Sequence, residues 1–280
     1  MAGTIVTSSA SQAPQEHGWY LYGIVRRDPG GAAPPWSGTT EHLQLLERGG
    51  LAAVVARVPV AEFTTEALQA RLGDPAGLES IVRMHNAVIG AVHQRQAILP
   101  AKLGAVYADL EDVAWAMEQR HDALAAQLER VDQCDEWAVH VYVDRPTVRA
   151  HLIAEQASDP VQQQLAAAGP GRAYLLRRKL ADSLAEKTAQ ILDDIAEAAY
   201  RQLAPLAVEA LAERPASPSG DDDGEVEVLR AALLVRRERR EELVAGVRAC
   251  AGERPGWRCT SSGPWPPYSF AASPESDGHA

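Results

Sequence analysis

Two histidines of one predicted helix are the first candidates for metal chemistry. His85 and His93 lie in the segment 77–95, whose apolar residues recur at helical spacing, so both would share its apolar side. Zinc ligands on a helix are expected at positions i and i+4, or as CxxC pairs, and a separation of eight residues matches neither pattern. We therefore interpret His85 as a core or interface histidine with one hydrogen bond, and we expect no metal.

Thiols, turns and acidic runs suggest equally little chemistry. The three cysteines, Cys134, Cys250 and Cys259, are odd in number and form no CxxC pair, so we predict no disulfide framework and no catalytic thiol. The turn at 169–172 opens a helix whose N–H groups could in principle hold an anion, but we interpret it as an ordinary helix-entry turn. The acidic run 221–223 lacks the alternation of an EF-hand loop and is interpreted as solvated.

No catalytic or cofactor-binding motif stands out. The sequence has no Walker A motif and no G-x-S-x-G nucleophile elbow, so we predict no catalytic residue and no cofactor. The basic clusters 177–179 and 236–240 are interleaved with or followed by acidic residues. That pattern is typical of surface ion pairs on helices rather than of a phosphate-binding track.

The composition excludes some classes of protein. The chain has 280 residues, 46% of them hydrophobic, and a formal net charge of −11. Non-specific nucleic-acid binding needs a basic face, so we expect no nucleic-acid partner. The N-terminus has no signal-peptide pattern, and no window reaches the roughly 18 to 20 apolar residues that span a membrane. We expect a soluble cytoplasmic protein.

Strands and helices alternate along the chain, with helices more abundant. In the first half, strands are expected at 19–28, 50–59 and 97–109 (broken near Pro100), and helices at 60–73, 77–95 and 110–131. In the second half, strands are expected at 136–143, 226–238 and 256–263, and helices at 144–156, 173–213 and 239–251. Pro205 should kink or split the helix 173–213, which would give a long helical pair.

These elements predict an α+β fold in two domains, each a small sheet with helices on one side. The expected limits are an N-terminal domain at 18–133 and a C-terminal α+β domain at 134–270. The second domain carries the long helices (173–213) and a flexible acidic loop (214–225). We expect residues 1–17 and 271–280 to be disordered tails.

Seven segments of the chain, taken in order, resemble the gas vesicle protein L/F family. They are WYLYGIV (19–25), LAAVVARVPVAEF (51–63), HNAVIGAV (85–92), ILPAKLGAVY (98–107), EWAVHVYVD (136–144), GPGRAYLLRRK (169–179) and GPWPPYSF (263–270). The resemblance extends from about residue 18 to 270. It departs from the family at Ala101–Lys102, where a Met–Arg or Leu–Arg type of pair is more usual, and at the acidic loop.

The resemblance implies a non-enzymatic role in the formation of gas vesicles, the hollow protein-walled flotation organelles of some prokaryotes. It implies an N-terminal domain of ferredoxin-like character, an α/β sandwich, and a C-terminal domain with long helices. The implied partners are the small hydrophobic shell protein and other accessory proteins, and the implied location is the gas vesicle within the cytoplasm.

The segment GPWPPYSF concentrates aromatic residues in a chain that has only two phenylalanines and six tryptophans. One hypothesis is that it is a proline-rich ligand for a partner, because an extended polyproline segment loses little entropy on binding. The other is that its side chains pack on the protein itself and its prolines hold it extended. The candidate interaction or packing residues are Trp265, Pro266, Pro267, Tyr268 and Phe270.

Two other functions remain open from the sequence. An enzyme of unknown type would need convergent polar groups in a pocket between the two domains, around His85, Lys102 or Asp144. A scaffold unrelated to vesicles would self-associate through the long helices 173–213.

Overall fold

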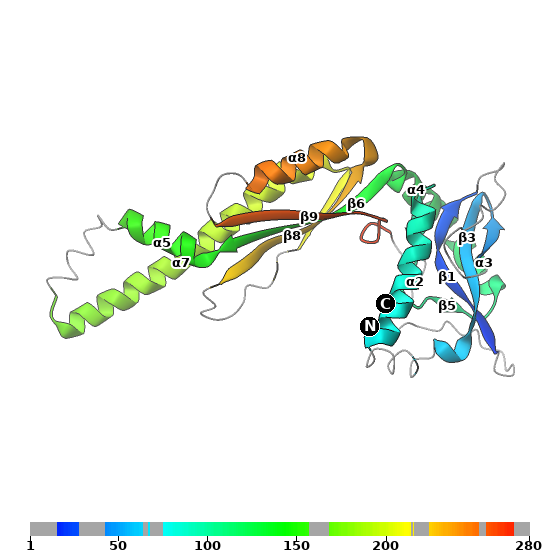
Figure 1. Ribbon diagram of the computed structural model, residues 1–280, viewed down its shortest axis with the longest axis horizontal. Helices are drawn as coiled ribbons and strands as arrows, with labels where there is room; N and C mark the ends of the chain where they lie inside the picture. The colour runs from blue at the N-terminus through cyan, green and yellow to red at the C-terminus, as the bar shows by residue number, and fades with distance from the viewer. Residues whose placement is uncertain are drawn as a thin grey trace. The chain divides into compact units, whose positions relative to one another are not determined.

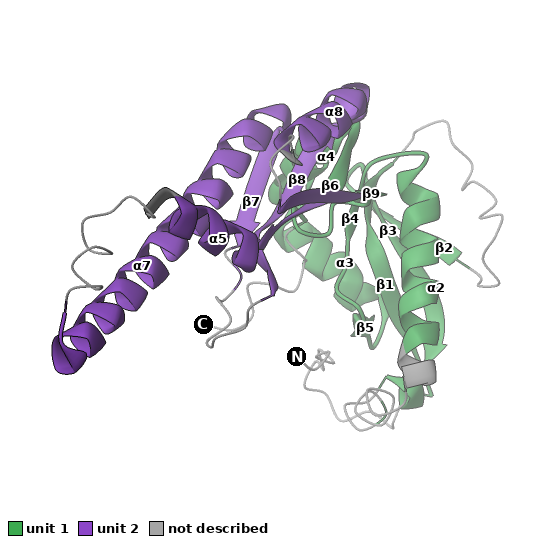
Figure 2. Cartoon of the chain, turned by 60° about the vertical axis from the view of Figure 1, so that its left-hand side comes forward, with its two compact units in different colours: residues 1–136, 264–280 green, residues 137–263 purple. Residues whose placement is uncertain are grey.

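The computed structural model describes residues 16–27, 43–63, 67, 75–156, 168–213, 215, 224–251 and 256–271. Over these residues it is a mixed α+β structure with six α-helices and two sheets, so the predicted α+β class is confirmed. The chain divides into two compact units (Figure 2). Unit 1 consists of Met1–Glu136 and Pro264–Ala280, and unit 2 consists of Trp137–Gly263.

Unit 1 is built on a five-stranded sheet. Its strands are β1 (His17–Arg26), β2 (Leu43–Arg48), β3 (Leu51–Pro59), β4 (Ile98–Pro100) and β5 (Val106–Tyr107). The strand order is β2-β3-β1-β4, with β5 also paired to β1, and these pairings are antiparallel. The apolar runs that predicted β1 and β3 are buried on both faces, as expected for central strands.

One glycine of β1 permits a close approach to β4. The register of β1 against β3 shifts between Leu21 and Gly23, and Gly23 lies opposite Pro100 of β4. A Cβ atom at position 23 would lie 2.6 Å from the Leu99 carbonyl oxygen and 2.8 Å from Cγ1 of Ile98. The two strands can pair at this distance only because residue 23 has no side chain.

Helices cover both faces of this sheet. They are α2 (Pro75–His93), α3 (Leu110–Gln119) and α4 (His121–Val131), with α2 on one side of the sheet and α3 and α4 on the other (Figures 1 and 2). Asp109 caps α3 by accepting a hydrogen bond from the Asp112 backbone N–H at 2.9 Å. The single helix predicted at 110–131 is two helices, because the backbone leaves the helical region at Arg120.

Unit 2 contains a four-stranded sheet with helices packed against it (Figure 1). Its strands are β6 (Cys134–Asp144), β7 (Glu209–Glu213), β8 (Glu225–Arg236) and β9 (Trp257–Trp265), in the order β7-β8-β6-β9. Its helices are α5 (Arg145–Gln156), α7 (Pro170–Leu203) and α8 (Arg240–Ala251). No helix in the described part of the chain has both the length and the hydropathy needed to cross a membrane.

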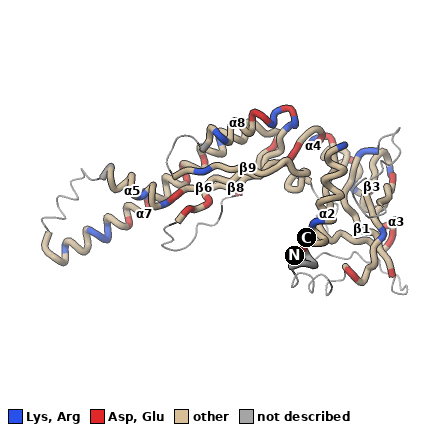
Figure 3. The backbone as a smooth tube through the Cα atoms, in the orientation of Figure 1, with Lys and Arg blue, Asp and Glu red and all other residues tan. Residues whose placement is uncertain are grey.

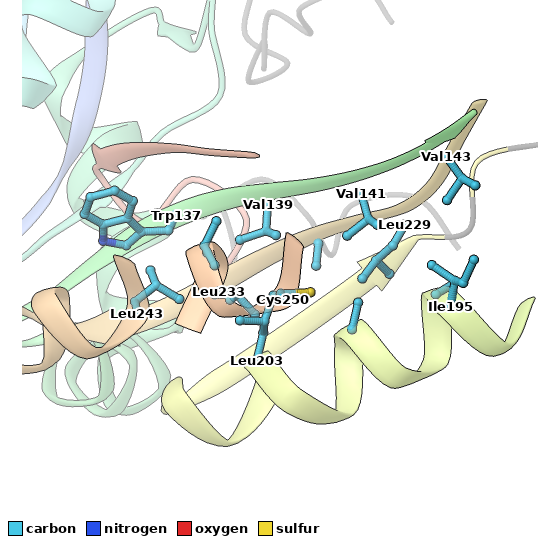
Figure 4. Close-up of a cluster of buried hydrophobic side chains, with 14 of the residues drawn as sticks. Trp137, Val139, Val141, Val143, Ile195, Leu203, Leu229, Leu233, Leu243 and Cys250 are labelled. Carbon is cyan, nitrogen blue, oxygen red and sulfur yellow. The ribbon is translucent and has the colours of Figure 1, made fainter. Parts of the chain in front are cut away.

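Alternate residues of β6 and β8 form the core of unit 2. Val139, Val141 and Val143 of β6 point toward the helices together with Leu229 and Leu233 of β8 (Figure 4). The helices contribute buried residues from α5, α7 and α8: Val148, Leu152, Leu184, Ile195, Leu203, Leu243 and Val247. This period of two is the alternation that predicted a strand at 136–143.

The prediction of a helix throughout 173–213 is wrong at its end. Helix α7 ends at Leu203, Pro205 lies in a short 3-10 turn (Ala204–Leu206), and Glu209–Glu213 is strand β7. Proline has no N–H to continue the helical ladder. The following residues instead pair with β8, beginning with a 2.7 Å hydrogen bond from the Val208 N–H to the Leu234 carbonyl. Tertiary pairing therefore overrides the helical propensity of this stretch.

The assignment of 264–270 to the C-terminal domain also differs from the structure, which groups Pro264–Ala280 with unit 1. The ferredoxin-like character expected of the N-terminal domain stays a prediction. Nearly all of the two predicted tails and of the acidic loop 214–225, including the run 221–223, lie outside the described residues. So does most of the helix predicted at 60–73, of which Val60–Glu62 form a 3-10 turn.

Candidate functional site

The C-terminal segment, residues 264–270, packs onto unit 1. Pro266, Pro267 and Phe270 are buried, with Phe270 only 3% exposed, and Tyr268 is half-buried. The Trp265 side chain is 49% exposed. Strand β9 ends at Trp265, and the chain then turns through a 2.7 Å hydrogen bond from the Tyr268 N–H to the Pro266 carbonyl. The extended conformation expected for the whole segment therefore stops before Tyr268.

Four hydrogen bonds hold this segment to residues far away in the sequence. The backbone N–H and the hydroxyl of Ser269 donate to the two carboxylate oxygens of Glu136, each at 2.7 Å. Arg130 donates to the Phe270 carbonyl at 2.8 Å, and the Tyr268 hydroxyl donates to Asn86 Oδ1 at 2.8 Å. Bonds to charged groups are stronger than neutral ones, so Glu136 and Arg130 anchor the segment at two points.

Burial dominates the electrostatics of this anchor. It raises the pKa of the Glu136 carboxyl, while the hydrogen bonds from Ser269 act in the opposite direction. Burial also raises the pKa of Tyr268 to about 12, with a further contribution from the charge of Glu136. Tyr268 is therefore neutral at physiological pH and serves as a hydrogen-bond donor.

A cavity of about 240 Å³ lies beside Tyr268. Helix α2, the end of β4, the residues that follow it and Tyr268 line the cavity: Val82, His85, Asn86, Pro100, Ala101, Lys102, Leu103 and Tyr268. Most of the lining surface is apolar, and its polar side chains are an imidazole, an amide, an ammonium group and a phenol. Such a surface suits an apolar side chain of a partner better than a polar metabolite.

A buried hydrogen-bond network fixes the loop that follows β4. The Gly104 N–H donates to the Tyr20 hydroxyl at 3.1 Å, and that hydroxyl lies 2.9 Å from His85 Nδ1. The His85 ring also hydrogen-bonds the Ala101 backbone, and the Ala101 N–H donates to the Tyr22 carbonyl at 2.9 Å. Satisfied buried networks of this kind rigidify their surroundings.

Lys102 and Leu103 lie at the tip of this fixed loop. The Ala105 N–H donates to the Lys102 carbonyl at 3.2 Å, and Gly104 has φ +84°, so residues 102–105 form a type II β-turn. Leu103 is 40% exposed. The exposed Lys102 side chain forms no ion pair with any residue that the structure describes. The turn therefore presents an apolar and a cationic side chain to solvent at the edge of the cavity.

His85 is a buried core histidine, as interpreted from the sequence, and its ring has two partners rather than one. Burial lowers its pKa to about 4, so the ring is neutral at physiological pH. A neutral ring engaged by a tyrosine and by the backbone is a structural group.

The lowered pKa of His85 predicts that the folded protein loses stability in acid. Between pH 6.5 and about 4 the unfolded chain binds a proton at His85 that the folded chain does not bind. The contribution of neutral His85 to the free energy of unfolding is thus fully present above pH 6.5. It is lost as pH falls toward 4, with a slope of at most about 1.4 kcal/mol per pH unit. Urea unfolding of the wild type and of His85→Gln across this range measures it. The difference between the two curves should change with pH, and a constant difference would contradict the assignment.

The other residues considered for chemistry have structural roles. His93 Nε2 lies 2.8 Å from an Asp135 carboxylate oxygen in a buried pair. Asp144 accepts hydrogen bonds from the N–H and hydroxyl of Thr147 at the start of α5, in unit 2, whereas His85 and Lys102 line the cavity of unit 1. Among the described residues, no group of three or more His, Cys, Asp or Glu side chains could hold a metal ion.

The structure also shows where the three cysteines and the turn at 169–172 lie. Cys134 is buried in β6, while Cys250 of α8 and Cys259 of β9 belong to the core of unit 2. The neighbouring Cys250 thiol, together with burial, raises the pKa of Cys259, which makes it an inert thiol. Gly169 precedes the first turn of α7.

Sequence reasoning missed the anchoring roles of Asn86, Arg130 and Glu136. Glu136 carried a usable signal, because a glutamate near the start of a buried strand requires a partner. Nothing in the local pattern pointed to Ser269 as that partner.

Comparisons with known proteins show what this chain is similar to. The family described as "Gas vesicle synthesis protein GvpL/GvpF" matches residues 18–272. The chain is 32% identical over 269 residues to gas vesicle protein L of Streptomyces sp. (strain CB03234), which covers 93% of this chain and 95% of that protein. It is 24% identical over 258 residues to gas vesicle protein F of the same strain, covering 90% and 98%.

Solved structures show the same fold. The crystal structure of GvpF from Anabaena sp. PCC7120 matches with a TM-score of 0.66 and 18% identity, over 91% of this chain and 98% of that chain. GvpF from Microcystis aeruginosa matches with a TM-score of 0.60 and 18% identity, over 91% and 99%.

Proposed function

Because this chain belongs to the gas vesicle synthesis protein GvpL/GvpF family, we propose that it is an accessory or minor structural protein of gas vesicle formation. The resemblance stated from the sequence is confirmed at the level of the family, which is a gas vesicle family and not a known enzyme family. In our proposal the protein acts at the gas vesicle within the cytoplasm. It binds the small hydrophobic shell protein, and other accessory proteins, during assembly.

The proposed contact is the turn 102–105 together with the adjacent cavity. The observation that supports it most is that Leu103, an exposed leucine, stands on a loop held by the Tyr20–His85 network. A preorganised apolar group loses little conformational entropy when it binds. The cavity beside it can take an apolar side chain, and Lys102 can pair with a carboxylate of the partner.

A chain of this kind can cover the apolar surface of a shell subunit before that subunit enters the wall. Uncovered apolar surfaces and open strand edges associate with one another, so an unassembled shell subunit is prone to aggregate. A reversible contact of modest area would prevent this and still release the subunit to the growing wall.

Leu103→Asp is expected to weaken binding of the purified shell protein at least about tenfold, because a carboxylate would replace the apolar group at the centre of the contact. Binding is measured by pull-down and by titration calorimetry with the refolded shell protein. Since Leu103 is exposed, the melting temperature should stay close to that of the wild type.

Trp115→Ser is the matched control, because Trp115 is a 64% exposed aromatic residue on α3, away from the cavity lining. Binding by Leu103→Asp at the wild-type level would refute this contact site. Absence of any association by the wild type, together with normal vesicles after deletion in the native host, would refute the proposed function itself.

A further inference from the structure

Helix α7 has a long exposed surface. It runs through 34 residues from Pro170 to Leu203, which corresponds to about 51 Å. Its buried residues, among them Ala173, Leu184 and Ile195, lie on the side that packs on α5 and the sheet. On the other side, Tyr174 and Leu175 are 63% and 65% exposed.

The charges of α7 are segregated along its length. The first ten residues, 170–179, carry four basic side chains and no acidic one, and 182–197 carry five acidic side chains and one basic one. Figure 3 shows the basic positions in blue and the acidic ones in red. The basic residues are Arg172, Arg177, Arg178 and Lys179, and the acidic ones are Asp182, Glu186, Asp193, Asp194 and Glu197.

This order of charges does not stabilise the helix on its own. The helix dipole favours acidic side chains near the N-terminus and basic ones near the C-terminus, which is the opposite arrangement. The surface pairing expected from the sequence occurs for Arg239 with Glu242, at 2.8 Å. Arg177, Arg178 and Lys179, however, form no ion pair with any residue in the described ranges.

Five of these charged side chains share one face of α7, while Arg177 lies on the opposite side of the helix. Leu175, Lys179, Asp182, Glu186, Gln190, Asp193 and Glu197 follow one another at intervals of three or four residues, and all are exposed. Residues at this spacing form one stripe along a helix. The stripe is apolar and basic at its beginning and acidic over the rest.

We propose that α7 pairs with α7 of a second copy of this chain in antiparallel orientation. In that arrangement the basic segment 170–179 of each helix faces the acidic segment 182–197 of the other, and the complementary contact forms twice about a two-fold axis. Tyr174 and Leu175 of each copy add apolar area at the two ends. A second copy fits better than an unrelated acidic protein, because only a second copy complements both halves of the stripe.

The test is a charge exchange on the full chain. One variant makes the basic segment acidic (Arg172→Glu, Arg178→Glu, Lys179→Glu), and the other makes the acidic segment basic (Asp182→Lys, Glu186→Lys, Asp193→Lys). Each variant alone should dimerise at least tenfold more weakly than the wild type. An equimolar mixture should recover the dimer, because each altered helix complements the other at both ends.

Sedimentation velocity measures the dimer, and the wild-type dimer should weaken between about 50 mM and about 500 mM salt. Three exposed arginines of unit 1 provide a control with the same change in net charge: Arg26→Glu, Arg83→Glu and Arg95→Glu. The control should dimerise as the wild type does, and circular dichroism verifies that each variant is helical. A wild type that stays monomeric at low salt, or a mixture that stays monomeric, overturns the proposal. Neither result bears on shell-protein binding through Leu103.

Discussion

Phe270→Ala is expected to destabilise the protein by roughly 3 to 5 kcal/mol, the usual cost of removing a buried phenylalanine ring. The residue is only 3% exposed, and its backbone is fixed at both ends. Its N–H donates to the Pro267 carbonyl and its own carbonyl accepts from Arg130, so the chain cannot easily move to fill the cavity. Urea unfolding followed by circular dichroism measures the change.

Trp265→Ala is the control for this experiment, because it removes a larger ring from the same segment. Half of the Trp265 side chain is already in solvent, so its removal should cost no more than about 1 kcal/mol. A larger loss for Trp265→Ala than for Phe270→Ala would contradict the packing described for this segment. Loss of partner binding by a stable Trp265→Ala protein would support the ligand hypothesis for GPWPPYSF.

Gly23→Ala is the second substitution with a large expected effect, a loss of about 3 kcal/mol. The added methyl group would meet the Leu99 carbonyl oxygen at 2.6 Å and the Ile98 side chain at 2.8 Å. Neither can yield easily, because the first belongs to the backbone of β4 and the second is a fully buried side chain. β1 and β4 would have to separate, which loosens the edge strand β4 from the sheet of unit 1. Thermal and urea unfolding report the loss.

Gly90→Ala makes the same chemical change where nothing opposes it. Gly90 lies inside α2, and a Cβ atom there would meet no other atom within 4 Å. Alanine is the better helix former, so this variant should be more stable by up to about 1 kcal/mol. Similar stabilities for the two variants would show that β1 and β4 are not as close as described.

The local sequence pattern was sufficient to predict those helices and strands whose own residues show a clear helical or alternating period. The helical spacing around His85 and the alternation in Glu136–Val143 predicted α2 and β6 within a few residues of their ends. The break at Pro205 was also predicted. The strand that follows it was not, because β7 exists only through its pairing with β8. The stretch 209–213 is rich in alanine and glutamate, which favour a helix, so only its pairing with the next strand shows it to be a strand.

The same reason explains what was missed at the candidate site. Ser269 and Glu136 are 133 positions apart, and Tyr268 and Asn86 are 182 apart. The composition of GPWPPYSF marked the segment as unusual but could not tell which side chains would be buried. From the sequence, Lys102 was considered only as part of a departure from the family pattern and as a candidate near an enzyme pocket, and Leu103 was not singled out. Their position at the tip of a turn depends on Tyr20 and His85, which come from two other elements.

The discontinuity of unit 1 has a consequence for biosynthesis. A ribosome completes residue 136 well before it reaches Pro264, and the whole of unit 2 is synthesised in between. At ordinary rates of translation this interval is on the order of ten seconds. Throughout it, the nascent N-terminal unit lacks Phe270 and the bonds from Ser269 to Glu136. A chain that terminates before Pro264 therefore lacks part of unit 1. Unit 1 can complete its fold only after the C-terminal segment has been synthesised.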